Sequence, residues 1–228
     1  RVAAGDISKY IGRYSETDLQ RIAQTSGRWE NLFHFSDGRA NVVEWMGVKE
    51  NAKALEIGAQ AGAISSVIID KYSSYAALDI DECFADLCKK RIRNEKLEYH
   101  ISAVHEYARD HLKEYDDIYM VGVLADAACY MGKDDSFDEL LQCAGDMLKE
   151  DGRLILATEN KLGLKYWAGC QEEYNGGYNI NIESFPNGEK KKTFSKGELE
   201  RELNAAGFTH LEWYYPYPDL YFAGQIYS

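Results

Sequence analysis

A glycine-containing turn preceded by a carboxylate is the strongest chemical signal in the sequence. The window Ala54–Ile64 runs from an apolar segment ending at Glu56 into small residues that include Gly58 and Gly62. A strand that enters a helix through such a turn directs backbone N–H groups to the carboxyl edge of a sheet, where ligands bind in open α/β folds. The sequence therefore predicts a ligand-binding loop at this window.

A second carboxylate stands at a spacing that suits a nucleoside. Asp79 follows an apolar segment and lies about 20 residues after Gly58, the spacing at which dinucleotide folds place the acid that binds ribose hydroxyls. The dinucleotide fingerprint would need glycines where Gln60 and Ala63 stand, so a pyrophosphate is disfavoured. S-adenosylmethionine, which carries no phosphate, tolerates a looser loop. The alternative is that the glycines only permit a tight turn and that Asp79 caps a strand end.

The elements that must position these residues alternate regularly from Ala54 onward. Near-continuous apolar segments are separated by amphipathic stretches, which predicts an α/β fold with a parallel sheet and helices on both faces. The predicted strands are Ala54–Ile57, Tyr75–Ile80, Leu97–Ala103, Asp117–Val123 and Arg153–Thr158. The predicted helices between them are Gly62–Lys71, Glu82–Asn94, Tyr107–Glu114 and Ser136–Lys149.

The regions on either side depart from this alternation. Glu16–Gln24 and Ala40–Met46 are helix-like, and we expect them to pack across one edge of the sheet or to cap the site. Asn160–Thr193 is long and rich in Gly, Asn and Tyr, which is typical of a functional loop.

The C-terminal region is regular again. Ser195 and Glu198 form a capping box for a helix that ends at Gly207. The segments Leu211–Tyr215 and Tyr221–Tyr227 are predicted to form a closing, hairpin-like pair of strands.

Several motifs in this order resemble class I S-adenosylmethionine-dependent methyltransferases. The first resembles the E-x-G-x-G-x-G loop of that family, with Gln60 at the middle glycine, and another resembles its L-K-x-G-G turn. The five windows are Glu56–Gly62, Ala77–Asp81, Tyr115–Tyr119, Leu148–Leu156 and Leu203–Phe208. The resemblance implies a Rossmann-like seven-stranded sheet of order 3-2-1-4-5-7-6 with the last strand antiparallel. It also implies a division into an N-terminal helical cap (1–50) and a methyltransferase domain (51–228) within one structural unit.

Two further windows, Phe35–Trp45 and Thr158–Tyr166, resemble bacterial methyltransferases associated with glycosyltransferases of surface-polysaccharide loci. This resemblance ranks O-methylation of a sugar or related polar metabolite first among possible reactions.

The family resemblance also implies a set of residues around the S-adenosylmethionine cofactor. The loop would surround its methionine moiety, the end of the second strand would bind ribose and adenine, and residues after the third and fourth strands would complete the site. These residues are Glu56, Gly58, Ala59, Gln60, Gly62, Asp79, Ile80, Ala103, Val104 and Val123. Gln60 places a side chain where the backbone normally approaches the cofactor, so affinity could be reduced or activity lost.

Methyl transfer from a sulfonium is an in-line displacement that needs an aligned nucleophile and, for a hydroxyl, a base. We expect the base at the carboxyl ends of the fourth and fifth strands. Glu159, with Asn160 beside it, is the first candidate, and the alternative is a structural hydrogen bond to the following loop. Asp126 is the second candidate, and the alternative is a helix N-cap.

Candidate acceptor-binding residues come from both ends of the chain. His34 and Arg39 lie in the N-terminal region, and Arg39 could pair a carboxylate or phosphate; the alternative is solvent exposure. Tyrosines gather after Glu159, where they either recognise a substrate or fill a core. They are Tyr166, Tyr174, Tyr178, Tyr214, Tyr215, Tyr217 and Tyr221, of which Tyr166 is the favoured substrate contact.

Composition sets expectations about partners. The 228 residues include 26 Lys plus Arg and 38 Asp plus Glu, for a net charge of −12, which predicts a small-molecule substrate and neither nucleic acid nor membrane as a partner. The one dense basic run, Lys190–Lys192, is expected to be a solvated loop. Five scattered cysteines predict a reducing, cytoplasmic setting, and the histidine spacings predict no metal site.

Two alternatives to a methyltransferase remain at this stage. One is a non-catalytic or regulatory S-adenosylmethionine-binding module with a degenerate glycine loop. The other is an NAD-dependent oxidoreductase.

Overall fold

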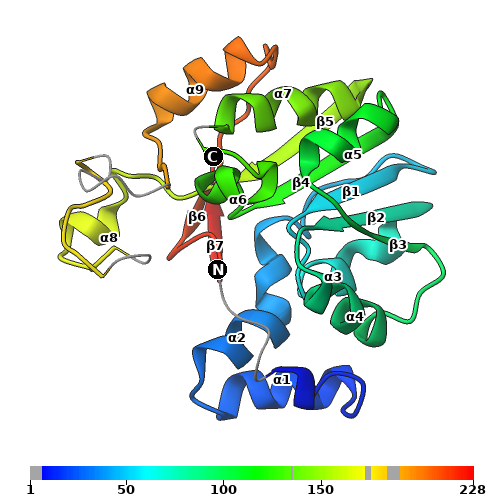
Figure 1. The fold of residues 1–228 in the computed structure, drawn as a ribbon. Helices are drawn as coiled ribbons and strands as arrows, with labels where there is room; N and C mark the ends of the chain where they lie inside the picture. The colour runs from blue at the N-terminus through cyan, green and yellow to red at the C-terminus, as the bar shows by residue number, and fades with distance from the viewer. Residues whose placement is uncertain (1–6, 135, 173–175, 184–190) are drawn as a thin grey trace.

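A five-stranded parallel sheet lies at the centre of the computed structural model, which describes residues 7–134, 136–172, 176–183 and 191–228 (Figure 1). Its strands follow the order β3-β2-β1-β4-β5. They are β1 (Lys53–Ile57), β2 (Ser74–Asp79), β3 (Leu97–Ile101), β4 (Tyr115–Val121) and β5 (Leu148–Ala157). The strand order reverses between β1 and β4, so the carboxyl ends of these two strands form the switch point where ligands bind in open sheets.

Helices cover both faces of the sheet, as the continuous apolar strands predict. Leu55 and Ile57 of β1 face the core that contains α5 (Val104–Asp110), α6 (Ala127–Met131), α7 (Phe137–Met147) and α9 (Lys196–Ala205). Ala54 faces the opposite core, with α3 (Ser65–Ile68), η3 (Ile69–Lys71) and part of α4 (Glu82–Arg91). Because alternate side chains of one strand enter two cores, the sheet is the inner layer of a three-layer unit.

The N-terminal region packs against α4 through a third apolar cluster that includes Ile7, Leu19, Phe35 and Phe84. It contains η1 (Ile7–Lys9), α1 (Glu16–Thr25), α2 (Trp29–Phe35) and η2 (Asp37–Val42). Arg91 belongs to α4, and its fully buried side chain holds the N-terminal region against this helix. Its guanidinium donates to the carbonyl of His34 at 2.6 Å and to Glu16 Oε2 at 3.1 Å.

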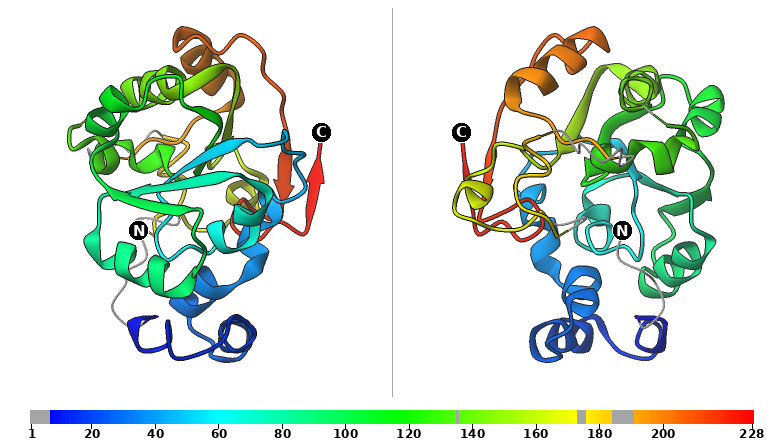
Figure 2. Two further views of the ribbon diagram at one scale, coloured as in Figure 1. Left: turned by 90° about the vertical axis from the view of Figure 1, so that its right-hand side faces the viewer. Right: turned by 60° about the vertical axis from the view of Figure 1, so that its left-hand side comes forward.

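The predicted seven-stranded sheet is wrong. Within the described residues the sheet has five strands, and β6 (Tyr215–Tyr217) and β7 (Gln225–Tyr227) form a separate antiparallel pair, which Figure 2 shows apart from it. Pro216 and Pro218 lack the N–H that strand pairing requires, so this segment cannot supply a continuous ladder to β5. An antiparallel pair is therefore present as predicted, but its first strand is Tyr215–Tyr217 and not Leu211–Tyr215, its second is Gln225–Tyr227, and the pair does not join the main sheet.

Two predicted helices differ in their bounds for local reasons. The helix predicted from Gly62 begins only at Ser65, because Gln60 (φ 48°) and Gly62 (φ 73°) keep the backbone in the left-handed region. The helix predicted from Tyr107 begins at Val104 instead. The capping box is confirmed: Ser195 and Glu198 each accept from the other's backbone N–H at the start of α9.

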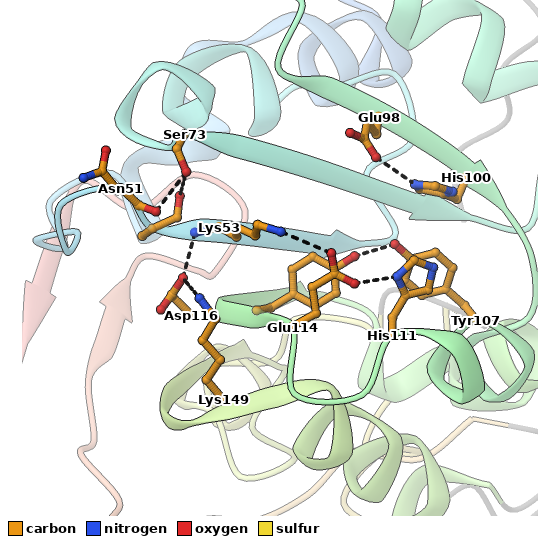
Figure 3. Close-up of polar contacts among 12 residues, drawn as sticks. Asn51, Lys53, Ser73, Glu98, His100, Tyr107, His111, Glu114, Asp116 and Lys149 are labelled. Atoms are coloured by element: carbon orange, nitrogen blue, oxygen red, sulfur yellow. Dashed lines mark hydrogen bonds and ion pairs between the residues drawn. The ribbon is translucent and has the colours of Figure 1, made fainter.

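The amino ends of β1 and β4 carry a polar network, drawn in Figure 3. Asp116 accepts from the backbone N–H of Lys53 at 2.8 Å and from Lys149 Nζ at 2.7 Å. Glu114 lies 2.7 Å from Nδ1 of His111 and 3.4 Å from Lys53 Nζ. These contacts join the strands at the edge opposite to the candidate site.

Three features of the described chain concern the predictions about cysteine oxidation state, metal binding and membranes. All five cysteines are free thiols. Among the residues described, no group of three or more His, Cys, Asp or Glu side chains is placed to hold a metal ion. Over the same residues, no helix has both the length and the apolar character needed to cross a membrane.

Candidate active site

The loop after β1 is shaped by close approaches at its glycines. A Cβ on Gly58 (φ 78°) would lie 2.7 Å from Cγ2 of Val123 and 2.8 Å from the hydroxyl oxygen of Tyr130. A Cβ on Gly62 would lie 2.7 Å from Cδ1 of Ile92. Both glycines are therefore favoured by local packing, and Val123 lies beside Gly58.

Gln60 departs from the glycine pattern but keeps a glycine-like backbone. Its φ of 48° is in the left-handed region, which L-residues other than Asn and Asp rarely adopt. Its carbonyl accepts from the hydroxyl of Tyr99 at 3.2 Å, and its N–H donates to Asp79 at 3.0 Å. The loop thus retains its shape without the middle glycine, at a cost in backbone strain.

Asp79 lies against this loop and is fully buried. One carboxylate oxygen accepts from the N–H of Gln60, and the other accepts from the N–H of Ile80 at 2.8 Å and of Asp81 at 3.3 Å. The loop and the acid at the end of β2 therefore meet, as their spacing predicts. The same hydrogen bonds fit the alternative in which Asp79 caps its strand end, so its contact with a ribose stays a prediction.

Glu56, at the carboxyl end of β1, is a buried carboxylate held by two hydroxyls. It accepts from Ser65 and, at 2.8 Å, from Tyr75. Burial raises the pKa of Glu56, and these two hydrogen bonds oppose that shift. The sequence gives no signal for Ser65 or Tyr75, because the strand and helix that carry them meet only in the fold.

The N-terminal region reaches this loop. Phe33, His34 and Arg39 share a small cavity of about 10 Å³ with the loop residues Glu56, Gly58, Ala59 and Gln60, among others. His34 is 1% exposed and Arg39 is 6% exposed, so the alternative of solvent exposure is wrong for both. Both side chains lie by the loop, and their contact with an acceptor stays a prediction.

Glu159 follows β5 and is buried against α8 (Leu164–Trp167). Lys165 Nζ lies 3.0 Å from one carboxylate oxygen, and the hydroxyl of Tyr166 donates to it at 3.2 Å. The short helix α8 thus brings a cation and a phenol to the candidate base. Asn160 instead stabilises the following turn, because its Oδ1 accepts a hydrogen bond from the N–H of Leu162 at 2.9 Å.

Asp126, the second candidate base, pairs with Lys191. Its side chain makes no capping hydrogen bond to α6, so the alternative of an N-cap is not supported. Lys192 lies 3.6 Å from the ring centroid of Phe137. Lys191 and Lys192 therefore each contact the protein, although the side chain of Lys192 remains 44% exposed; Lys190 lies outside the described residues.

The remaining predicted residues vary in position. Ala59 is buried in the loop, Ile80 packs against the core, Ala103 precedes α5, and Val104 is fully buried in the core. Among the predicted tyrosines, Tyr166 and Tyr221 are buried, whereas the others that the structure describes are exposed. Those exposed tyrosines are Tyr178, Tyr214, Tyr215 and Tyr217, and Tyr174 lies outside the described residues.

Comparison with solved structures confirms the predicted resemblance at the level of the fold. An S-adenosylmethionine-dependent methyltransferase from Mesorhizobium loti superposes with a TM-score of 0.59 and 12% identity, over 81% of this chain and 86% of that one. Another, from Archaeoglobus fulgidus, gives 0.57 and 16%, over 78% and 72%. The fold and the loop after β1 define this chain as having the class I S-adenosylmethionine-dependent methyltransferase fold.

No family model matches the sequence. Among curated proteins, a tRNA1(Val) (adenine(37)-N6)-methyltransferase from Yersinia enterocolitica is 27% identical over 137 residues, which cover 52% of this chain and 54% of that protein. The chain thus spans about half the length of the curated relatives that it matches. These relatives are named for a nucleic-acid substrate, which overturns the prediction that excludes nucleic acid as a partner. Net charge is a property of the whole surface, and it does not exclude a local binding site.

Proposed function

We propose that this chain is an S-adenosylmethionine-dependent methyltransferase. The observation that supports this proposal most directly is the 3.0 Å hydrogen bond from the N–H of Gln60 to Asp79, which joins the loop and the acid at the switch point of the sheet. Asp79 stands at the end of β2, the position from which an acidic residue binds ribose hydroxyls in dinucleotide folds. The residues present therefore fit the nucleoside of the cofactor.

In this proposal the cofactor supplies an electrophilic methyl group, and the protein aligns the acceptor and excludes water. Glu56, Gly58, Ala59, Gln60 and Gly62 would hold its methionine moiety. Asp79 and Ile80 would bind ribose and adenine. Ala103, Val104 and Val123 would complete the site.

For the acceptor, we propose a hydroxyl of a sugar or related small polar molecule. Glu159 would take the proton, since it lies at the carboxyl end of β5 and within 3.2 Å of the hydroxyl of Tyr166. Lys165 Nζ contacts both carboxylate oxygens of Glu159, at 3.0 and 3.1 Å, so an acceptor hydroxyl would need to displace the ammonium group. Tyr166 and His34 would contact the acceptor, and Asp126 with Asn160 would be secondary candidates for the chemistry.

A second candidate is methylation of tRNA, which the names of the curated relatives favour. The end of β4 reads Gly122-Val123-Leu124-Ala125 in place of the N/D-P-P-Y/F motif common to enzymes that act on adenine nitrogens. An adenine acceptor would therefore need other groups to bind its exocyclic nitrogen.

Calorimetry with S-adenosylmethionine and S-adenosylhomocysteine tests the cofactor. We expect both to bind, and the lack of binding by either at millimolar concentration would exclude the proposal. Tighter binding of NAD than of S-adenosylmethionine in a thermal-shift comparison would favour the oxidoreductase alternative.

Transfer of a labelled methyl group tests the acceptor. The protein would be incubated with bulk tRNA and, separately, with a small-metabolite extract. Label in the small-molecule fraction supports O-methylation, label in tRNA supports the second candidate, and cofactor binding without transfer to either supports a non-catalytic module.

A further inference from the structure

Arg39 is a buried cation with unused hydrogen-bonding capacity. It is 6% exposed, and its guanidinium carbon lies 3.8 Å from the ring centroid of Phe33 and 5.0 Å from that of Tyr221. Its Nε and Nη1 have no hydrogen-bond partner among the described residues. A buried donor left without a partner costs about 1–3 kcal/mol, and more when it is charged. The fold tolerates this cost at Arg39, which lies beside the loop after β1.

A second buried arginine shows what a structural role looks like in this chain. The side chain of Arg91 is fully buried too, but its guanidinium donates to the carbonyls of His34 and Ala61 and to the carboxylate of Glu16. Arg39 makes no comparable set of contacts within the described residues. The difference indicates that the partner of Arg39 is a ligand.

The cavity at Arg39 contains charges of both signs. Glu56 lines it together with Arg39, and Gly58 and Gln60 form part of the same wall. The carboxylate of Glu56 is hydrogen-bonded to Ser65 and Tyr75, so it does not satisfy the guanidinium. Burial lowers the pKa of Arg39 to about 10, which leaves the group charged at neutral pH. An α-amino acid, with a carboxylate at one side and an ammonium at the other, complements this pair of charges.

We propose that Arg39 binds the α-carboxylate of the methionine moiety of S-adenosylmethionine, an inference that rests on the proposed function. Asp79, the candidate for the nucleoside end, is not among the described residues that line the cavity at Arg39, so we assign the amino-acid end of the cofactor to this cavity. A guanidinium binds a carboxylate through two parallel N–H···O bonds, from Nε with Nη2 or from Nη1 with Nη2, and at Arg39 either pair includes a nitrogen that has no partner among the described residues. The N-terminal region thereby becomes part of the cofactor site.

The test compares ligands that differ only at the amino-acid end. S-adenosylhomocysteine carries that end, whereas 5′-methylthioadenosine has the same nucleoside and thioether without it. Calorimetry would be run on the wild-type chain, on Arg39→Met and Arg39→Lys, and on Arg21→Gln. Arg21 serves as a matched control because its side chain is 69% exposed in the same N-terminal region.

We expect Arg39→Met to weaken S-adenosylhomocysteine about ten- to hundredfold, since a charge-assisted hydrogen bond contributes about 1.5–3 kcal/mol. Arg39→Lys restores part of this loss, Arg21→Gln behaves as wild type, and 5′-methylthioadenosine binds all four proteins within about twofold. The melting temperature of ligand-free Arg39→Met equals or exceeds that of wild type, because an unpaired buried charge has been removed.

Unchanged S-adenosylhomocysteine affinity in Arg39→Met overturns the inference while the proposed function stands. An equal loss for both ligands, with a lower melting temperature, also overturns it and shows a structural role. If the wild-type chain binds neither S-adenosylmethionine nor S-adenosylhomocysteine, the proposed function itself fails.

Discussion

Lys165 Nζ lies 3.0 Å from a carboxylate oxygen of Glu159 at the carboxyl end of β5. The carboxylate is 6% exposed, and both of its oxygens face α8 through Lys165 and Tyr166. A buried carboxylate that keeps a cation and a phenol within reach is suited to hold a polar acceptor and to accept its proton. This pair is the basis of the first prediction.

We expect Glu159→Gln to lower turnover about 10²- to 10⁴-fold with little change in the affinity for S-adenosylmethionine, because a general base contributes in that range. Single-turnover methyl transfer and calorimetry measure the two quantities. Glu183→Gln, a change in a carboxylate after α8, is the control. Unchanged turnover in Glu159→Gln would remove Glu159 from the mechanism.

Gly58→Ala should destabilise the protein by about 2–3 kcal/mol. The new Cβ would meet Val123 and Tyr130 below 3 Å, and the backbone has a φ of 78°. The matched control is Gly197→Ala in α9, where the nearest atom is 3.9 Å away and alanine favours the helix by about 1 kcal/mol. Urea denaturation of both variants measures the difference, and equal stabilities would refute the packing argument.

Gln60→Gly should stabilise the protein by about 1 kcal/mol, because glycine adopts the left-handed backbone at residue 60 without strain. The backbone N–H that donates to Asp79 is kept. Affinity for S-adenosylmethionine should be equal or higher, since a side chain has been removed from the loop. Weaker cofactor binding would instead give the Gln60 side chain a direct role.

Glu198 gives a pH-dependent prediction. Its hydrogen bond from Lys161, together with that from the backbone of Ser195, lowers the pKa of Glu198 to about 2. A lowered folded-state pKa stabilises the protein above the unfolded value, near pH 4.3, and this stabilisation is lost as the pH falls towards 2. Glu198→Gln should therefore cost about 1 kcal/mol at pH 7, the range of a helix cap, and progressively less on acidification. Parallel urea titrations at pH 7 and pH 3 test this, and a constant difference would contradict it.

The sequence predicts those parts of the structure that depend on local pattern. The five parallel strands, the capping box at Ser195 and the meeting of Asp79 with the loop all follow from apolar periodicity and spacing. The position of Arg39 between Phe33 and Tyr221 depends on contacts between distant segments. The pairing of Lys165 with Glu159 is local, but it depends on the short helix α8, which lies in a segment without clear periodicity. The sequence does not predict the partner of β6 either, because its apolar and aromatic residues do not indicate whether it pairs with β5 or with β7.

Arg91 holds the N-terminal region against α4, and Phe33, His34 and Arg39 of that region line the cavity of about 10 Å³ at the loop. A nucleoside cofactor is far larger than this space, so in the proposed function we expect its binding to displace side chains of this region. The contacts of Arg91 and the apolar cluster around Phe35 and Phe84 would then oppose release of the spent cofactor. A burst of product in the first cycle, followed by slower steady accumulation, is the kinetic pattern that we expect when release is slower than transfer.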